Sequence, residues 1–282
     1  MKDKKKKIFW IASYPKSGNT WMRAIISSLF FTKDGVFNFD LLKNILDFDI
    51  KERYEFVRSI NSDDFNKLFE LKTIAKYRIR AQKIAKIGGD FAFYKTHSAN
   101  ISTNGYDFTN NSNTFGLIYL VRDPRDIAIS YASHLGKTID EAIYIMSKKN
   151  ALTYTPSQYP VLMSKWDYHY LSWNNLNVPK IIIKYENLLN NTGAVLNEII
   201  EFFIYNFDIN INFKNIEFEN IIKSTQFKKL QKDEKSFGFG ESGKSVFFRK
   251  GKAMQWKEKL TNEQIKKIEE TFKSNMIALG YI

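Results

Sequence analysis

The sequence of 282 residues contains no cysteine, only three histidines and only five prolines. Without cysteine the chain can form neither disulfides nor thiolate metal sites, and it has no thiol nucleophile. No uncharged apolar stretch reaches the roughly 18 residues that a membrane-spanning helix needs. The apolar stretch at 8–12 behind the N-terminal lysines is also too short for a signal-peptide core. We therefore expect a cytoplasmic protein without stable membrane insertion.

Acidic residues are also fewer than basic ones: the chain has 30 Asp and Glu and 43 Lys and Arg, so its formal net charge is +13. Such an excess favours anionic partners, among them nucleic acids, anionic membranes and phosphorylated small molecules. Because basic residues alternate with acidic ones along most predicted helices and form no stripe, we expect no nucleic-acid partner. With 44% hydrophobic and 16% aromatic residues, the chain can build a large core. One domain over residues 1–282, preceded by a basic tail at 1–7, is the simplest organisation.

Short apolar runs alternate with segments of helical periodicity. The runs predict buried strands at 8–12, 91–95, 117–121 and 180–185. Helices are predicted from Thr20, over a helical excursion at about 39–87, and at 126–135, 139–148 and 168–176. This alternation is typical of an α/β fold, whose parallel sheet binds ligands at the carboxyl ends of its strands.

The segment Tyr14-Pro15-Lys16-Ser17-Gly18-Asn19-Thr20-Trp21 joins the first predicted strand to a helix. Gly18 allows the backbone to approach a ligand closely, and the N-terminus of the helix points its N–H groups toward it. Lys16, Ser17, Asn19 and Thr20 can add further donors. The segment therefore predicts a phosphate-binding loop.

A second segment, residues 238–245, matches the nucleotide-binding pattern G-x-x-x-x-G-K-S at every position. That pattern requires a buried strand before it and a helix after it. Here a polar stretch at 232–236 precedes it, and Phe-Phe-Arg-Lys-Gly at 247–251 follows. We interpret it as a flexible polar loop that matches by chance.

The loop at 14–21 resembles that of the sulfotransferases that use 3′-phosphoadenosine-5′-phosphosulfate (PAPS), which carry Y-P-K-S-G-x-x-W after their first strand. Four further segments resemble the family's motifs in the same order: 122–131, 185–187, 224–227 and 247–257. The resemblance implies a single three-layer domain with a central, mainly parallel sheet flanked by helices, like that of the P-loop nucleotide hydrolases. It also implies sulfuryl transfer from PAPS to an acceptor, with 3′-phosphoadenosine-5′-phosphate (PAP) as product and without a metal.

The resemblance assigns roles in nucleotide binding to residues outside the loop. Arg122 and Ser130 would bind the 3′-phosphate, and an arginine fork suits a phosphate on physical grounds as well. The segment Phe248, Arg249, Lys250 and Gly251 would close over the same group, although Met254-Gln255 stand where the family usually has Gly-Asp. Tyr185, Thr225 and Phe227 would lie on the adenine side. Trp21 either stacks on the adenine or packs in the core.

His97 is the candidate general base, because it follows the second predicted strand next to Lys95. A neutral imidazole can take a proton from an attacking hydroxyl near neutral pH. The family places a histidine there, and we assign Lys16 to the leaving 5′-phosphate and Lys95 to the sulfuryl oxygens. His134 and His169 lack such a context and are interpreted as structural.

The motifs do not identify the acceptor. By position, the excursion at 39–87 and the polar loop at 100–113 would line its side of the site. A hydroxyl or amine of a small molecule, glycan or lipid fits, and a homodimer also stays open. A P-loop kinase-like phosphotransferase is the second reading, and it would need a magnesium-binding Asp or Glu at a strand end. A basic nucleic-acid-binding protein is the third.

Overall fold

The computed structural model describes residues 7–85, 91–207, 217–241 and 247–282. Its centre is a five-stranded sheet in the order β2-β3-β1-β4-β7, in which every neighbouring pair is parallel. The strands are β1 (Lys7–Ser13), β2 (Leu46–Asp47), β3 (Phe91–Thr96), β4 (Thr114–Val121) and β7 (Lys180–Lys184). All four predicted strands are therefore confirmed, and β2 adds a short edge.

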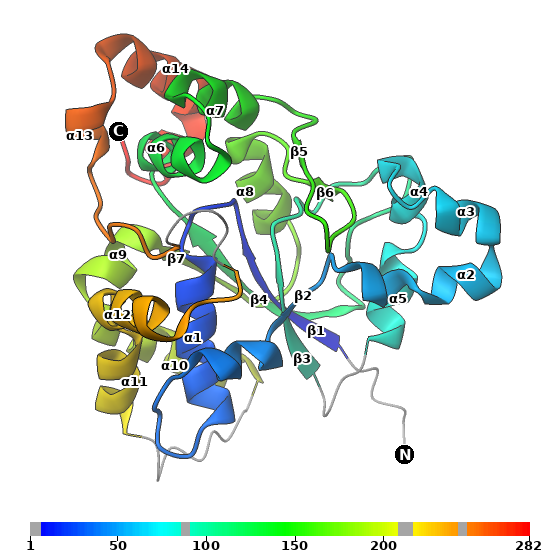
Figure 1. Ribbon diagram of the computed structural model, residues 1–282, viewed down its shortest axis with the longest axis horizontal. Helices are drawn as coiled ribbons and strands as arrows, with labels where there is room; N and C mark the ends of the chain where they lie inside the picture. The colour runs from blue at the N-terminus through cyan, green and yellow to red at the C-terminus, as the bar shows by residue number, and fades with distance from the viewer. Residues whose placement is uncertain (1–6, 86–90, 208–216, 242–246) are drawn as a thin grey trace.

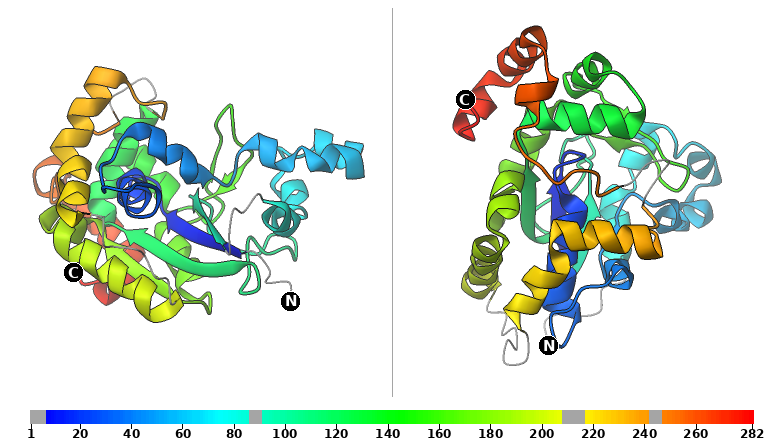
Figure 2. Two further views of the ribbon diagram at one scale, coloured as in Figure 1. Left: turned by 90° about the horizontal axis from the view of Figure 1, so that it is seen from below. Right: turned by 60° about the vertical axis from the view of Figure 1, so that its left-hand side comes forward.

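Helices cover both faces of the sheet (Figures 1 and 2). One layer contains α1 (Asn19–Phe31), α9 (Tyr185–Asn190), α10 (Thr192–Phe207), α11 (Phe218–Thr225) and α12 (Phe227–Phe237). The other contains α6 (Pro124–Leu135), α7 (Ile139–Met146), α8 (Trp166–Asn174) and α14 (Asn262–Ala278), which the short α13 (Trp256–Lys259) precedes. Within the described ranges, every helix is too short or too polar to span a bilayer.

Strand β1 shows why three layers form. Ile8 and Trp10 point into one buried cluster, whereas Phe9 and Ile11 point into the other. Successive side chains of a strand face opposite sides of the sheet, so a continuous apolar run needs a helical layer on each face. The predicted three-layer α/β architecture with a mainly parallel sheet is confirmed.

The helices of the second layer begin and end at residues suited to those positions. The Asp123 carboxylate accepts the Arg125 N–H at the start of α6, and Gly136 ends that helix with a φ of 64°. Thr138 forms a capping box at the start of α7, as Thr261 does at the start of α14. These local signals fix where the helices that flank the site begin.

The helical excursion predicted at about 39–87 is broken into short pieces on one side of the molecule (Figure 1). They are η1 (Phe39–Asn44), β2, η2 (Lys51–Tyr54), α2 (Phe56–Ile60), α3 (Ser62–Asn66), α4 (Leu71–Ala75) and α5 (Arg78–Ile84). The continuous helical prediction was wrong at β2, because Leu46 and Asp47 pair with β3, a tertiary contact that local periodicity cannot show. A hairpin of β5 (Leu152–Thr153) and β6 (Val161–Leu162) was also not predicted.

Candidate active site

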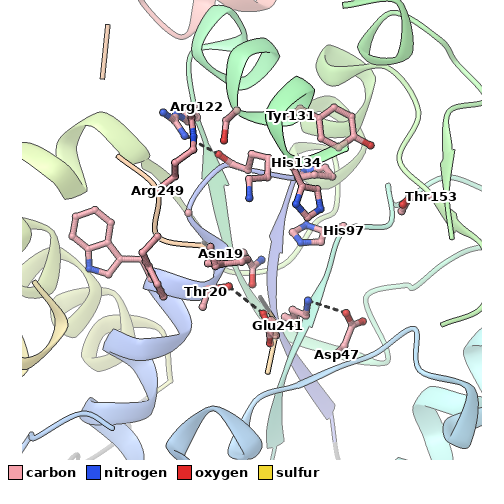
Figure 3. Close-up of a pocket in the computed structure, with 18 of the residues that line it drawn as sticks. Asn19, Thr20, Asp47, His97, Arg122, Tyr131, His134, Thr153, Glu241 and Arg249 are labelled. Atoms are coloured by element: carbon pink, nitrogen blue, oxygen red, sulfur yellow. Dashed lines mark hydrogen bonds and ion pairs between the residues drawn. The ribbon is translucent and has the colours of Figure 1, made fainter. Parts of the chain in front are cut away.

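The carboxyl ends of the parallel strands surround one cavity of ≈ 600 Å³ (Figure 3). Its walls include the loop after β1, the ends of β2 and β3, the first residue after β4 and the start of α9. Most of the predicted site residues line it: Lys16, Gly18, Asn19, Thr20, Trp21, Lys95, His97, Arg122, Ser130, Tyr185, Phe227, Phe248, Arg249, Lys250 and Gly251. Segments that are far apart in the sequence thus meet at one place.

The loop after β1 has the backbone of an anion cradle. Lys16 and Gly18 both have positive φ, at 68° and 96°. A Cβ on Gly18 would lie 2.8 Å from the Tyr185 ring, so only glycine fits without a shift. The chain then enters α1 at Asn19, and the first N–H groups of a helix have no partner within the helix.

Four buried polar atoms of the segment at 14–21 have no hydrogen-bond partner: the Tyr14 and Ser17 hydroxyls, the Asn19 Oδ1 and the Trp21 indole nitrogen. Ser17 is fully buried and does not itself line the cavity. Burial, and then the charges of Arg122 and Arg249, lower the pKa of Lys16 to about 8. This cationic, partly unsatisfied loop is suited to a bound anion.

Arg122 connects the loop after β1 to the C-terminal segment. Its Nη1 donates to the Lys16 carbonyl at 3.0 Å, and its Nη2 donates to the Lys252 carbonyl at 3.2 Å. The guanidinium group of Arg122 lies 4.1 Å from the centre of the Tyr185 ring. Its Nε is buried without a partner. Arg122 therefore braces two walls of the cavity and retains a donor.

An aromatic pocket forms the end of the cavity next to these cations. Trp21 makes edge contacts with Tyr185 and Phe227, at 6.0 and 5.9 Å between ring centres. Trp21 is only 4% exposed, yet it lines the cavity, so it both packs in the core and faces the site. A Cβ on Gly251 would lie 2.3 Å from the Phe227 ring, which requires glycine there. Thr225 lies behind this wall, fully buried, and its hydroxyl donates to the Ile221 carbonyl.

His97 lies beyond the cradle, at the end of β3. Its Nδ1 is 2.8 Å from the Ser13 carbonyl oxygen. A carbonyl only accepts, so the proton belongs on Nδ1 and the lone pair on Nε2. Burial, and then the charge of Lys95, lower the pKa of His97 to about 4. The imidazole is therefore neutral near pH 7 and able to accept a proton.

Helix α8 and strand β4 hold the backbone of His97 in place. The Nε2 of His169 donates to the His97 carbonyl at 3.1 Å, which leaves Nδ1 of His169 to accept from the Tyr119 hydroxyl at 2.8 Å. The indole of Trp173 donates to the next carbonyl, that of Ser98, at 2.9 Å. The structural interpretation of His169 agrees with this buried contact.

Two carboxylates stand near Lys95. Asp47 lies 2.9 Å from its Nζ. Burial raises the pKa of Asp47, but the charge and hydrogen bond of Lys95, together with the hydrogen bond from the Asp49 N–H, outweigh burial, and the net pKa is lowered. Glu241 pairs with Arg23 at 2.5 Å and accepts from the Thr20 hydroxyl at 3.3 Å. For Glu241 too, burial is outweighed by the charges of Lys95 and Arg23, and its pKa is lowered.

The sequence did not reveal these carboxylates or the turn at 153–158, which also lines the cavity. His134, interpreted as structural, has an exposed side chain that lines the cavity beside His97 (Figure 3). The loop at 100–113 was expected on the acceptor side but contributes no residue to the lining, and that expectation was wrong. Apart from Glu241, these positions lie in no sequence motif, because tertiary contacts bring them together.

Glu241 belongs to the G-x-x-x-x-G-K-S match that the sequence context argued against. Helix α12, and no strand, precedes this match, and no helix begins at 247–251 after it. Its residues 242–245 lie outside the described residues. Gly240 and Glu241, however, line the cavity, so this end of the segment belongs to the site.

Comparison with known proteins identifies similar chains. A family model described as a sulfotransferase domain matches residues 6–280. Flavonol 4′-sulfotransferase of Flaveria chlorifolia is 23% identical over 290 residues, which cover 97% of this chain and 80% of that protein. Luciferin sulfotransferase of Photinus pyralis is 22% identical over 298 residues, which cover 96% of this chain and 72% of that protein.

Two solved structures have a similar fold. Mouse sulfotransferase SULT7A1 complexed with PAP matches with a TM-score of 0.58 and 21% identity, covering 96% of this chain and 84% of that one. Retinol dehydratase in a complex with retinol and PAP matches with a TM-score of 0.61 and 20% identity, covering 95% and 81%.

Proposed function

Because the chain is a sulfotransferase, a member of the sulfotransferase domain family, we propose that it transfers the sulfuryl group of PAPS to a hydroxyl or amine acceptor. One observation carries the proposal: a single cavity joins the loop at 16–21, the cations Arg122 and Arg249, and His97. An anion site and a neutral base thus face the same space. The acceptor group can belong to a small molecule, a glycan or a lipid.

The donors of the cavity fit the two phosphate groups of PAPS. Arg122, which lines the cavity, and Ser17, in the loop next to it, each have a buried donor atom without a partner, and such atoms cost free energy unless a ligand or water satisfies them. In our proposal the loop, with Lys16, Ser17, Gly18, Asn19 and Thr20, holds the 5′-phosphate. Arg122, Ser130, Arg249, Lys250 and Gly251 hold the 3′-phosphate, and Trp21, Tyr185, Thr225, Phe227 and Phe248 surround the adenine.

The reaction is an in-line displacement at sulfur. Nε2 of His97 takes the proton of the acceptor hydroxyl as its oxygen forms a bond to sulfur. The bond between sulfur and the bridging oxygen of PAPS breaks, and PAP leaves with that oxygen. Charge develops on the peripheral oxygens and on the leaving phosphate, as in phosphoryl transfer. Lys95 stabilises the former and Lys16 the latter, and the proposed mechanism needs no metal.

Isothermal titration calorimetry with PAP, AMP, ATP with magnesium and a DNA duplex tests this proposal. We expect PAP to bind in the low micromolar range or more tightly, and AMP to bind more weakly because it lacks the 3′-phosphate. Equal affinity for PAP and AMP would contradict the assignment of Arg122, Ser130 and Arg249. Preference for ATP with magnesium would favour a kinase-like enzyme, and preference for DNA a nucleic-acid-binding protein.

A further inference from the structure

The two ends of the cavity differ in chemistry (Figure 3). The end that holds Arg122 and Arg249 is walled by the aromatic rings of Trp21, Tyr185, Phe227 and Phe248. Away from those rings, Figure 3 shows Thr153 on the far side of His97, Asp47 below His97, and Glu241 between Asp47 and Thr20. The proposed nucleotide end is therefore aromatic and cationic, whereas the acceptor end presents hydrogen-bonding groups and carboxylates.

The polar groups of the acceptor end are anchored. The side chain of Asp47 is 12% exposed; it accepts from the Asp49 N–H at 2.9 Å and from Gln158 Nε2 at 2.5 Å, in addition to pairing with Lys95. Glu241 is anchored by Arg23 and Thr20. Neither carboxylate can leave the wall without losing charged or hydrogen-bonded partners.

The turn between β5 and β6 completes this wall, and backbone contacts fix it. The Lys51 N–H donates to the Ser157 carbonyl at 3.0 Å, and the Tyr159 N–H donates to the Asp49 carbonyl at 3.1 Å. From this segment Thr153, Thr155, Ser157 and Gln158 line the cavity, with Pro156 among them. Four of these five side chains can form hydrogen bonds.

Desolvation decides which acceptor such a wall suits. A flat aromatic ring placed against Asp47, Glu241 and Gln158 would remove water from them and return no hydrogen bond, which costs free energy at each group. A molecule with several hydroxyls would replace the water, since each hydroxyl can donate to a carboxylate and accept from an amide or hydroxyl. Apart from the four rings of the nucleotide end, the apolar lining among the described residues consists of Pro15, Ile50, Tyr131, Leu135, Pro156 and Phe247.

We propose that the acceptor is a polyhydroxylated ring, a sugar or cyclitol, rather than an apolar phenol. One ring hydroxyl gives its proton to His97 and receives the sulfuryl group, while its neighbours bind Glu241, Asp47 and the turn at 153–158. This inference rests on the proposed function, because it assumes that sulfuryl transfer takes place at His97. It narrows the acceptor class to one that the names of the similar proteins do not give.

A transfer assay with labelled PAPS tests the class directly. The acceptors are methyl β-D-glucopyranoside, myo-inositol, the disaccharide cellobiose, octyl β-D-glucopyranoside and, as the apolar phenol, 2-naphthol. We expect kcat/KM for the best polyol to exceed that for 2-naphthol by about tenfold or more. A preference for 2-naphthol, or no transfer to any polyol by a protein that binds PAP, overturns the inference. Loss of PAP binding itself would instead count against the proposed function.

The same assay separates the sources of such a ring. Transfer to the methyl glucoside and inositol indicates a free small molecule, transfer favoured by cellobiose indicates a glycan, and transfer favoured by the octyl glucoside indicates a lipid headgroup. Saturation-transfer NMR of the methyl glucoside with the protein–PAP complex adds a reading that does not require turnover. We expect saturation to pass from the protein to the ring protons of the glucoside. If neither this saturation nor sulfuryl transfer to a polyol is observed, the proposal is contradicted.

The variant Thr153→Val removes one hydroxyl from the wall at nearly constant volume. We expect KM for the preferred polyol to rise about three- to tenfold, the factor that corresponds to one neutral hydrogen bond, with kcat little changed. Thr271→Val is the matched control and should leave KM unchanged, because Thr271 on α14 is half-buried, like Thr153, but does not line the cavity. Glu241→Gln should raise the same KM. If Thr153→Val and Glu241→Gln both bind PAP and keep the wild-type KM, this wall does not bind the acceptor.

Discussion

Lys16 combines an unusual backbone conformation with an unusual charge environment. Its φ of 68° is rare for a residue with a side chain, and its ammonium group lies 4.6 Å from the centre of the Phe247 ring. Its pKa of about 8 in the free protein places its titration within the range of ordinary buffers. Phosphate binding requires the charged form, so the affinity for PAP should depend on pH.

We expect PAP to bind at full strength below the pKa of Lys16 and to weaken progressively as pH rises through about 8. Deprotonation removes the cation, and bound PAP stabilises the protonated form. Calorimetric titration across this range measures the decline. Lys16→Arg is the control, because a guanidinium stays charged throughout and should abolish the decline. An identical decline in Lys16→Arg would assign it to another group.

His97 is the residue at which binding and chemistry should separate. His97→Ala or His97→Asn removes the proton acceptor but leaves the cradle at 16–21 intact. We expect turnover on an alcohol to fall about 10²–10⁴-fold with PAP affinity unchanged. An amine or a readily ionised phenol should show a smaller loss, because less proton transfer is needed. Near-wild-type turnover of His97→Ala on an alcohol at neutral pH would show that the base lies elsewhere.

The lowered pKa of His97 leads to a second prediction, which concerns the pH dependence of kcat/KM. A histidine with an ordinary pKa of about 6.5 would lose its basic form below neutral pH. With a pKa of about 4 in the free protein, His97 should stay neutral until well below that range. The acid limb of kcat/KM, which reports groups of the free enzyme, should therefore appear near pH 4. An acid limb near pH 6.5 that vanishes in His97→Asn would contradict the lowered pKa.

At the scale of elements, α8 contributes no residue to the lining of the cavity, but it holds the backbone of His97 in place. His169 donates to the His97 carbonyl and accepts from Tyr119, so we interpret it as a positioning residue. His169→Leu should lower kcat about 10–100-fold by letting the end of β3 shift, with PAP affinity unchanged. His169→Gln should restore much of kcat, since an amide can make both hydrogen bonds. Equal kcat for the Leu and Gln variants would show that only packing matters there.

The elements that the sequence predicts are specified by local residue patterns, whereas those that it misses depend on tertiary contacts. The runs at 8–12 and 117–121 were predicted as buried strands because their apolar character is local. Strand β2 has two residues and exists only through its pairing with Tyr94 and Lys95 of β3. The hairpin of β5 and β6 is equally short. Such pieces have no periodicity from which they could be predicted.

The same distinction holds within the site. The loop at 14–21 and the position of His97 follow from contiguous residues next to strands, and the structure places both at the cavity. Asp47 and Glu241 are nearly 200 positions apart and meet only because the sheet places β2 near the segment after α12. Their roles, like those of all the assigned side chains, stay predictions until variants are measured.

At the scale of the whole molecule, the cavity depends on both ends of the chain. The cradle follows β1, whereas Arg249, Lys250 and Gly251 lie near the C-terminus. Asp126 on α6 accepts the Met254 and Trp256 N–H groups at 2.7 and 3.1 Å and so holds the segment after Gly251. That residues 1–282 form a single domain stays a prediction, but these contacts make the site sensitive to how the C-terminal segment docks.

Arg125 is the centre of that docking. Its guanidinium pairs with Asp123 at 2.7 Å and Glu269 at 2.6 Å, and donates to the Tyr281 carbonyl at 2.9 Å. It also lies 3.8 Å from the centre of the Trp256 ring. The side chain is 5% exposed, so these interactions take place largely away from water. One residue of α6 thus contacts α13, α14 and the C-terminal residues.

We expect Arg125→Ala to reduce the free energy of unfolding by about 3–5 kcal/mol, because it leaves the buried Asp123 carboxylate without its cation. Urea denaturation measures this change. The affinity for PAP should also fall, since α13 would no longer hold the segment that carries Arg249 and Gly251. Arg125→Lys should be intermediate, because an ammonium group cannot reproduce the fork. Arg80→Ala is the control: Arg80 is exposed and lies 5.7 Å from the Phe56 ring centre. If Arg125→Ala were no less stable than Arg80→Ala, the C-terminal segment would be held by its apolar contacts alone.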